Sequence, residues 1–152
     1  MSALEQIKRK FAGQVEVQEK SPRRVYLTAA KELARTIVRY CFCDLGARFS
    51  IVSAVDTRTG VELLYHLAFD REQLMLTVKT LVKKPELEME SCTDFMPAAN
   101  WIEREIAEMF GVKFAGHPQL ATLLLPDDWP DGVYPLRKNS FDSEKENTER
   151  EN

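Results

Sequence analysis

Apolar residues recur at helical spacing in three parts of the chain. The first part begins with a capping sequence at Ser2 and ends near Phe11. The second runs over residues 28–43, and the third over residues 100–110. Gly111 follows the third part and suits the left-handed turn that often ends a helix. The pattern therefore predicts three helices, of which the last has the most unusual composition.

Between these helices the pattern changes to one typical of strands. Two short strands are predicted over residues 14–19 and 24–27, and three longer ones over 48–56, 61–70 and 74–82. Apolar and polar residues alternate in the longer strands, so each should place one face on a core. The connections are tight, which favours antiparallel neighbours. We predict a two-layer α+β fold, with helices on a mixed, mostly antiparallel sheet.

The character of the sequence changes again after Phe114. Four of the seven prolines fall within residues 118–135, among six large apolar side chains. Such a segment cannot form a regular ladder, yet it is too apolar to be left in water. We predict an α+β domain over 1–114 and an extended arm over 115–141, which lies either on a partner or on the domain's own core. Residues 142–152 contain no aliphatic side chain and are expected to be a disordered acidic tail.

Composition narrows the classes of function. At 152 residues the chain should form one domain, and no apolar run approaches the roughly 20 residues that cross a bilayer. The first ten residues lack a signal-peptide core. The net charge of −3 resides in the tail, which leaves 19 basic and 19 acidic residues elsewhere. Nucleic acid is therefore not an expected partner, and any contact with a membrane should run through other proteins.

The third helix carries charges at the border of its apolar stripe, namely Glu103, Arg104, Glu105 and Glu108. Losing one partner of a buried charge pair costs about 3–5 kcal/mol, so these groups need fixed partners. Glu105 and Glu108 could also form a metal-binding or acid–base pair. However, that helix has no histidine at the spacing a carboxylate-bridged metal site requires. We therefore favour structural anchoring over catalysis.

The cysteines and histidines indicate no chemical site. Cys41 and Cys43 are two residues apart, which is neither a redox CxxC motif nor a zinc pair. With Cys92 there are three thiols, one fewer than an iron–sulfur cluster usually requires. We expect buried, reduced cysteines. The two histidines are His66 in a strand and His117 in a Gly-His-Pro turn, where hydrogen bonding to backbone is the simpler interpretation.

The third helix also resembles a known signature, from Glu103-Arg104-Glu105 through an acid to Phe110-Gly111. It is similar to the 30 kDa (NuoC-like) subunit of respiratory complex I, a family that includes subunits of energy-converting hydrogenases and related membrane oxidoreductases. The likeness extends over about residues 94–138. It continues through Phe114, Gly116-His117-Pro118, Leu120, Leu124-Leu125-Pro126, Asp128-Trp129 and Pro135-Leu136-Arg137-Lys138. Two positions depart from the family, since Glu108 and Asn139 stand where Asp is usual.

The resemblance implies a cofactor-free structural subunit in the peripheral arm of a membrane-bound, ion-translocating oxidoreductase, on the cytoplasmic side of the membrane. It would pack on the large catalytic subunit, which is related to the large subunits of nickel–iron hydrogenases, and near the small iron–sulfur subunit. Iron–sulfur clusters, and nickel–iron in hydrogenase-type complexes, would sit on those partners. The implied anchor residues are Glu103, Arg104, Glu105, Glu108, Phe110, Gly111, His117, Pro118, Leu125, Asp128, Trp129, Arg137 and Lys138.

One alternative from another class stays open. The protein could be a free-standing α+β enzyme or a ligand-binding module. Its site would then use Glu105, Glu108 and His117.

Overall fold

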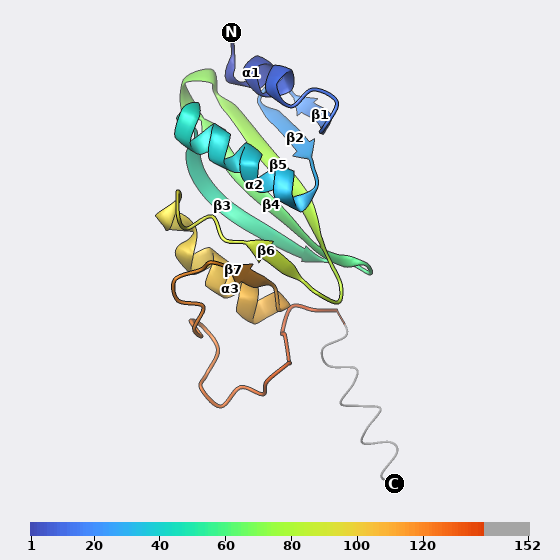
Figure 1. Cartoon of the computed structure of the whole chain (residues 1–152), viewed down its shortest axis with the longest axis vertical. Helices are drawn as coiled ribbons and strands as arrows, with labels where there is room; N and C mark the ends of the chain where they lie inside the picture. Colours follow the sequence, from blue (N-terminus) through green and yellow to red (C-terminus); the bar gives the residue numbers. More distant parts are fainter. Residues whose placement is uncertain (139–152) are drawn as a thin grey trace.

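The computed structural model describes residues 1–138 (Figure 1). Its main elements are α1 (Ala3–Lys10), β1 (Glu16–Ser21), β2 (Arg24–Thr28), α2 (Lys31–Arg39), β3 (Arg48–Asp56), β4 (Gly60–Phe69), β5 (Leu74–Lys83), β6 (Glu88–Glu90), α3 (Asn100–Phe110) and β7 (Lys113–Ala115). Short helical turns lie at η1 (Tyr40–Asp44), η2 (Asp70–Glu72) and η3 (Pro97–Ala99). Within residues 1–138 no helix is long and apolar enough to cross a membrane.

Five strands form one sheet in the order β1-β2-β5-β4-β3. The predicted antiparallel meander of β3, β4 and β5 is present, and β1 and β2 form a hairpin. β2 pairs with β5 in the parallel direction, which makes the sheet mixed. In Figure 1, α2 lies across one face of this sheet and α1 lies near its β1–β2 end. The two-layer α+β architecture predicted from the sequence is confirmed.

Buried and partly exposed side chains alternate along β4, and this alternation determines which face of the sheet the helices cover. Leu63, Tyr65 and Leu67 are fully buried, whereas the residues between them are partly exposed. α2 contributes Ile37 and Val38 to the same core. Because neighbouring side chains on a strand point to opposite faces, this period-two pattern gives the sheet one apolar face for the helices.

A second, smaller unit extends this core. β6 and β7 pair in the parallel direction, and α3 connects them; all three lie together at one end of the sheet (Figure 1). Met89, Phe114, Ile106 and Phe110 bring this unit into the same hydrophobic cluster as the main sheet. The sequence analysis did not predict these two strands, which have three residues each.

The second helix differs from its predicted range, residues 28–43, at both ends. Thr28, the first residue of the predicted range and a possible helix cap, pairs with Lys79 and is held in β2. α2 begins at Lys31, after Ala30, which has no capping side chain. At its other end the helix continues into the π-helical turn η1. Parallel strand pairing thus outweighs the capping preference of a threonine in this position.

The three cysteines are free, and two of them are buried. Burial raises the pKa of Cys41 to about 12 and that of Cys92 to about 12, so both thiols stay protonated at neutral pH. Cys43 is exposed, which corrects the expectation that all three would be buried.

Candidate functional site

The candidate site is built around α3, whose charged side chains reach three different surroundings. The helix follows the turn η3, which starts at Pro97, and it ends at Gly111 with a φ of 76°. Within residues 1–138 no side chain caps the N-terminus of α3, although Ser91 and Thr93 lie in the segment before it. The hydroxyl of Ser91 serves a carboxylate of the helix instead.

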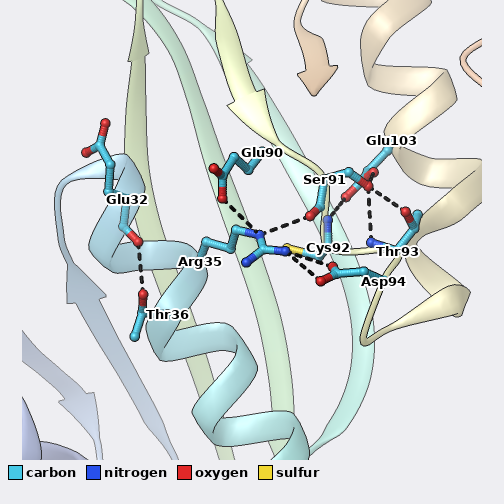
Figure 2. A network of polar contacts seen from close by, with 9 residues as sticks. All are labelled: Glu32, Arg35, Thr36, Glu90, Ser91, Cys92, Thr93, Asp94 and Glu103. Atoms are coloured by element: carbon cyan, nitrogen blue, oxygen red, sulfur yellow. Dashed lines mark hydrogen bonds and ion pairs between the residues drawn. The ribbon is translucent and has the colours of Figure 1, made fainter. Parts of the chain in front are cut away.

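That carboxylate belongs to Glu103, whose side chain is fully buried. Its Oε1 accepts a hydrogen bond from the Cys92 backbone N–H at 2.8 Å, and its Oε2 accepts one from the Ser91 hydroxyl at 2.6 Å (Figure 2). The Ser91 hydroxyl in turn lies 2.7 Å from that of Thr93. Burial raises the pKa of Glu103 and outweighs these two hydrogen bonds, which act in the opposite direction.

Arg35 ties the same segment to α2. Its Nε donates to the Ser91 carbonyl at 3.0 Å, and its Nη2 donates to Asp94 at 2.8 Å (Figure 2). A looser ion pair with Glu90 spans 3.4 Å. Sequence reasoning did not single out Arg35, because it lies 56 residues from Ser91 and on a helix that reads as ordinary. The result is a polar bridge from α2 through the loop after β6 to α3.

His117 lies on the other side of Glu103, with a buried side chain. Its Nε2 is 3.0 Å from the Asn100 carbonyl, and its Nδ1 is 3.0 Å from the backbone N–H of Gln119. Nε2 thus faces a backbone acceptor and Nδ1 faces a backbone donor, which fixes the orientation of the ring. Nε2 is 4.0 Å from Glu103, so the histidine adds a polar neighbour to that carboxylate without a direct hydrogen bond.

Arg104 and Glu108 hold the arm by its backbone. The guanidinium of Arg104 donates to the carbonyls of Ala121 at 2.9 Å and Thr122 at 2.7 Å. One helical turn later, Glu108 accepts from the backbone N–H groups of Leu123 and Leu124. Two side chains thus hydrogen-bond the backbone of four successive residues, 121–124. The arm forms no helix or strand between 116 and 138, so these contacts replace the ladder it lacks.

The far end of the arm returns to the C-terminus of α3. The Leu136 backbone N–H donates to the Met109 carbonyl at 3.1 Å, and Arg137 Nε donates to the Phe110 carbonyl at 2.7 Å. The Arg137 guanidinium also lies over the Tyr134 ring, 4.3 Å from its centroid. These contacts satisfy helix carbonyls that otherwise lack partners.

Asp56 provides a further attachment, which the sequence analysis missed. Its Oδ2 accepts from the backbone N–H of Lys138 at 3.0 Å, and its Oδ1 pairs with Lys84 Nζ at 2.7 Å. Burial acts to raise the pKa of Asp56, but the hydrogen bonds from Lys84 and Lys138 lower it overall. Asp56 is the last residue of β3. A single acid at the end of a strand does not indicate in the sequence that it holds another segment.

Four further predicted anchor residues belong to the part of the arm between residues 118 and 129. Pro118 and Asp128 are exposed, and Leu125 and Trp129 are partly buried. The Trp129 indole N–H donates to the Val133 carbonyl at 2.9 Å, a contact internal to the arm. Trp129 thus contributes to the shape of the arm itself.

The three residues of the alternative site are not brought together. His117 lies beside Glu103, and both carboxylate oxygens of Glu108 hold the arm. Glu105 lines a different surface, next to Trp101. Among residues 1–138 no group of three or more histidine, cysteine or acidic side chains could hold a metal ion.

Comparisons with known proteins agree with one another. The family model described as "Respiratory-chain NADH dehydrogenase, 30 Kd subunit" matches residues 27–146. The chain is 34% identical over 144 residues to hydrogenase-4 component G of Escherichia coli (strain K12), covering 91% of this chain and 26% of that protein. It is 35% identical over 122 residues to the C subunit of the F(420)H(2) dehydrogenase of Methanosarcina mazei, covering 78% and 77% respectively. The chain thus spans about a quarter of the hydrogenase component's length.

A solved structure is similar over almost the whole fold. One polypeptide of the membrane-bound sulfane sulfur reductase, described as an archaeal respiratory membrane complex, superposes with a TM-score of 0.81 at 26% identity. The match covers 96% of this chain and 89% of that one. The common architecture therefore includes the arm as well as the sheet.

Proposed function

The protein belongs to the family of the 30 kDa subunit of respiratory-chain NADH dehydrogenase, and we propose that it is a structural subunit of a membrane-bound oxidoreductase complex. Its relatives carry names such as hydrogenase-4 component G, formate hydrogenlyase subunit 5 and the C/D subunit of NADH-quinone oxidoreductase. These names refer to components of multi-subunit enzymes. A role as one subunit among several is the function they have in common.

In finer detail, we propose that the protein packs on the large catalytic subunit, near the small iron–sulfur subunit, on the cytoplasmic side of the membrane. It would carry no cofactor, and the iron–sulfur or nickel–iron centres would belong to those partners. The expectation rests on the sequence, which has three cysteines and no histidine at metal-ligand spacing on the third helix. A stoichiometric iron or zinc signal in the pure protein after washing with chelator would contradict it.

The observation that carries the proposal is the state of the arm. α3 holds its backbone through Arg104 and Glu108, while large apolar side chains face solvent. Leu120, Leu124 and Leu136 are 41%, 58% and 55% exposed. A segment whose main chain is fixed and whose apolar side chains are free suits a preformed docking surface.

We retain the division into a domain (1–114), a partner-binding arm (115–141) and an acidic tail (142–152) as part of this proposal. The last strand ends at Ala115 and residues 116–138 form no helix or strand, which supports a boundary between domain and arm near this position. Residues 139–152, which include the predicted tail, lie outside the described part of the chain.

We expect the tagged full-length protein, purified at its natural abundance from its own cells, to bring a set of oxidoreductase subunits with it. Hydrophobic burial against those subunits should make the association survive gel filtration. Mass spectrometry of the eluted complex identifies them. A stable monomer recovered alone, or one that binds a small molecule, would favour the alternative of a free-standing enzyme or ligand-binding module.

Arg104→Ala should loosen the arm and reduce assembly of the complex. Hydrogen bonds to a charged group are worth about 1.5–3 kcal/mol, so amide exchange over residues 121–124 should accelerate by about tenfold or more. Hydrogen exchange on the isolated protein and native gels of the complex measure the two effects. Arg58→Ala, which changes an exposed arginine in the β3–β4 turn, is the matched control. Normal assembly with abolished turnover would instead assign Arg104 a role in catalysis.

A further inference from the structure

A solvent-facing groove lies on the flank of α3 that the contacts described above do not use. Edge strand β3 forms one wall through Phe49 and Ile51, α3 forms the floor with Trp101 and Glu105, and the arm forms the other wall with Leu124. The hollow has a volume of about 430 Å³. Three segments that are distant in sequence thus converge on one apolar surface.

The apolar side chains that line this groove are unusually exposed. Trp101 is 71% exposed, Leu124 is 58% exposed and Ile51 is 45% exposed. A single exposed apolar side chain is ordinary, but a contiguous group around a hollow marks an interaction site. Tryptophan is also among the residues most enriched where binding energy concentrates.

Glu105 distinguishes this groove from a simple apolar patch. Its helix neighbours Glu103, Arg104 and Glu108 all have hydrogen-bond partners within the chain. Among residues 1–138, Glu105 has no hydrogen bond or ion pair, and it is the only charged side chain lining the groove. A carboxylate at an apolar surface is costly to cover unless the covering group brings a cation.

We propose that the groove receives a segment of a neighbouring subunit that presents an arginine or lysine beside apolar side chains. The cation pairs with Glu105, and the apolar groups pack on Trp101 and Leu124. Trp101 and Glu105 are four residues apart, so they share one helix face. One guanidinium can therefore reach the carboxylate while lying over the indole ring. This inference rests on the proposed function and names one surface through which the protein would contact a neighbouring subunit.

Other occupants fit the groove less well. Its volume falls in the range of small-molecule pockets, roughly 300–1,000 Å³, but such pockets need several converging polar groups. Among the lining residues, only Glu105, Ser50 and the indole N–H of Trp101 offer polar groups. The protein's own residues 142–152 have a net charge of −3, the same sign as Glu105. The shift in pairing register between Phe49 and Ile51 interrupts the edge of β3, which favours docking through side chains over addition of a strand.

Recovery of the neighbouring subunits by the tagged full-length protein, in its own cells, tests the proposal. Trp101→Ala should weaken the association by roughly 30-fold, as expected for an aromatic anchor of an interface. Glu105→Arg should weaken it at least as much, because it places two cations together, and Glu105→Gln should weaken it less. Glu16→Arg on β1 is the matched charge-reversal control and should assemble as the wild type does. Circular dichroism melts of the isolated variants verify that each still folds.

Photo-crosslinking identifies the occupant. A benzophenone amino acid at Ala98, an exposed residue of the groove, should crosslink to a peptide of another subunit that contains arginine or lysine beside apolar residues. Crosslinks to a second copy of this protein, to its own residues 139–152, or to a peptide without a cation would overturn the inference. Undiminished recovery by both Trp101→Ala and Glu105→Arg would overturn it while leaving the proposed function intact. If the wild-type protein recovers no subunit, the proposed function fails and this inference fails with it.

Discussion

Glu103→Ala is expected to destabilise the isolated protein more than any other single change to a charged side chain of α3. The substitution leaves the buried Cys92 backbone N–H without its acceptor and removes one hydrogen-bond partner of the Ser91 hydroxyl. Each buried donor left unpaired costs about 1–3 kcal/mol, and the space of the lost side chain adds to that cost. Urea unfolding of the purified protein measures the effect. A loss no larger than that of Glu105→Ala would show that the Glu103 network contributes little to stability.

Glu103→Gln separates the charge of this residue from its hydrogen bonds. Burial raises the pKa of Glu103 in the folded state above its value in the unfolded chain, about 4.3. The stability associated with the protonated form is therefore fully present below about pH 4. It is lost as pH rises through the raised pKa. The wild type should thus lose stability relative to Glu103→Gln over that window, and parallel pH profiles would contradict this assignment.

The stability that Asp56 contributes has the opposite pH dependence, so Asp56 provides a comparison for Glu103 within the same protein. The hydrogen bonds from Lys84 and the Lys138 backbone lower its pKa in the folded state. Its contribution to stability is present above the unfolded pKa, about 3.9, and is lost as pH falls through the lowered value. Asp56→Asn should therefore reduce the acid sensitivity of the protein, whereas Glu103→Gln acts at higher pH.

The sheet was predictable because its pattern is long. β3, β4 and β5 have nine or ten residues each, so alternation is visible and the buried face of β4 can be read residue by residue. β6 and β7 have three residues each, too few for any period to emerge. Their parallel pairing depends on contacts with the common core.

The candidate site was predictable in its members but not in its geometry. A resemblance to a known signature identified Glu103, Arg104 and Glu108, and border charges on an apolar stripe indicated fixed partners. Those partners are chiefly backbone groups, such as the carbonyl of Ala121 and the N–H of Cys92. Every residue has such groups, so a sequence cannot reveal which of them a side chain selects. Arg35 was missed for a related reason, since its acceptor is a carbonyl 56 residues away.

The full burial of Glu103 could not be predicted for the same reason, because its partners lie on a loop whose path the sequence does not reveal. On a helical wheel it lies at the border of the apolar stripe, where the sequence indicates a need for a fixed partner without identifying that partner. The loop after β6 covers that flank and supplies two donors. Only the path of that loop, which the short β6 strand sets, makes a buried carboxylate at this position stable.

Gly111→Ala is expected to detach the far end of the arm from α3. Gly111 has a φ of 76°, and a Cβ there would lie 2.4 Å from Arg137 Nη2 and 2.7 Å from the Tyr134 ring. Arg137 cannot simply move aside, because its Nε donates to the Phe110 carbonyl and its guanidinium lies over Tyr134. The variant therefore adds the loss of these contacts to a backbone strain of about 1 kcal/mol.

Gly116→Ala supplies the matched control for this last prediction. Gly116 has a similar φ of 80°, but a Cβ there meets nothing within 4 Å. Gly116→Ala should show the backbone strain alone, whereas Gly111→Ala should lose about 1–3 kcal/mol more, with faster amide exchange over residues 134–138. Urea unfolding and hydrogen exchange on both variants measure the difference. Because the exposed Leu136 belongs to this end of the arm, Gly111→Ala should also recover fewer partner subunits from cells than Gly116→Ala does. Equal behaviour of the two variants would mean that the seat of Arg137 on α3 does not position the arm.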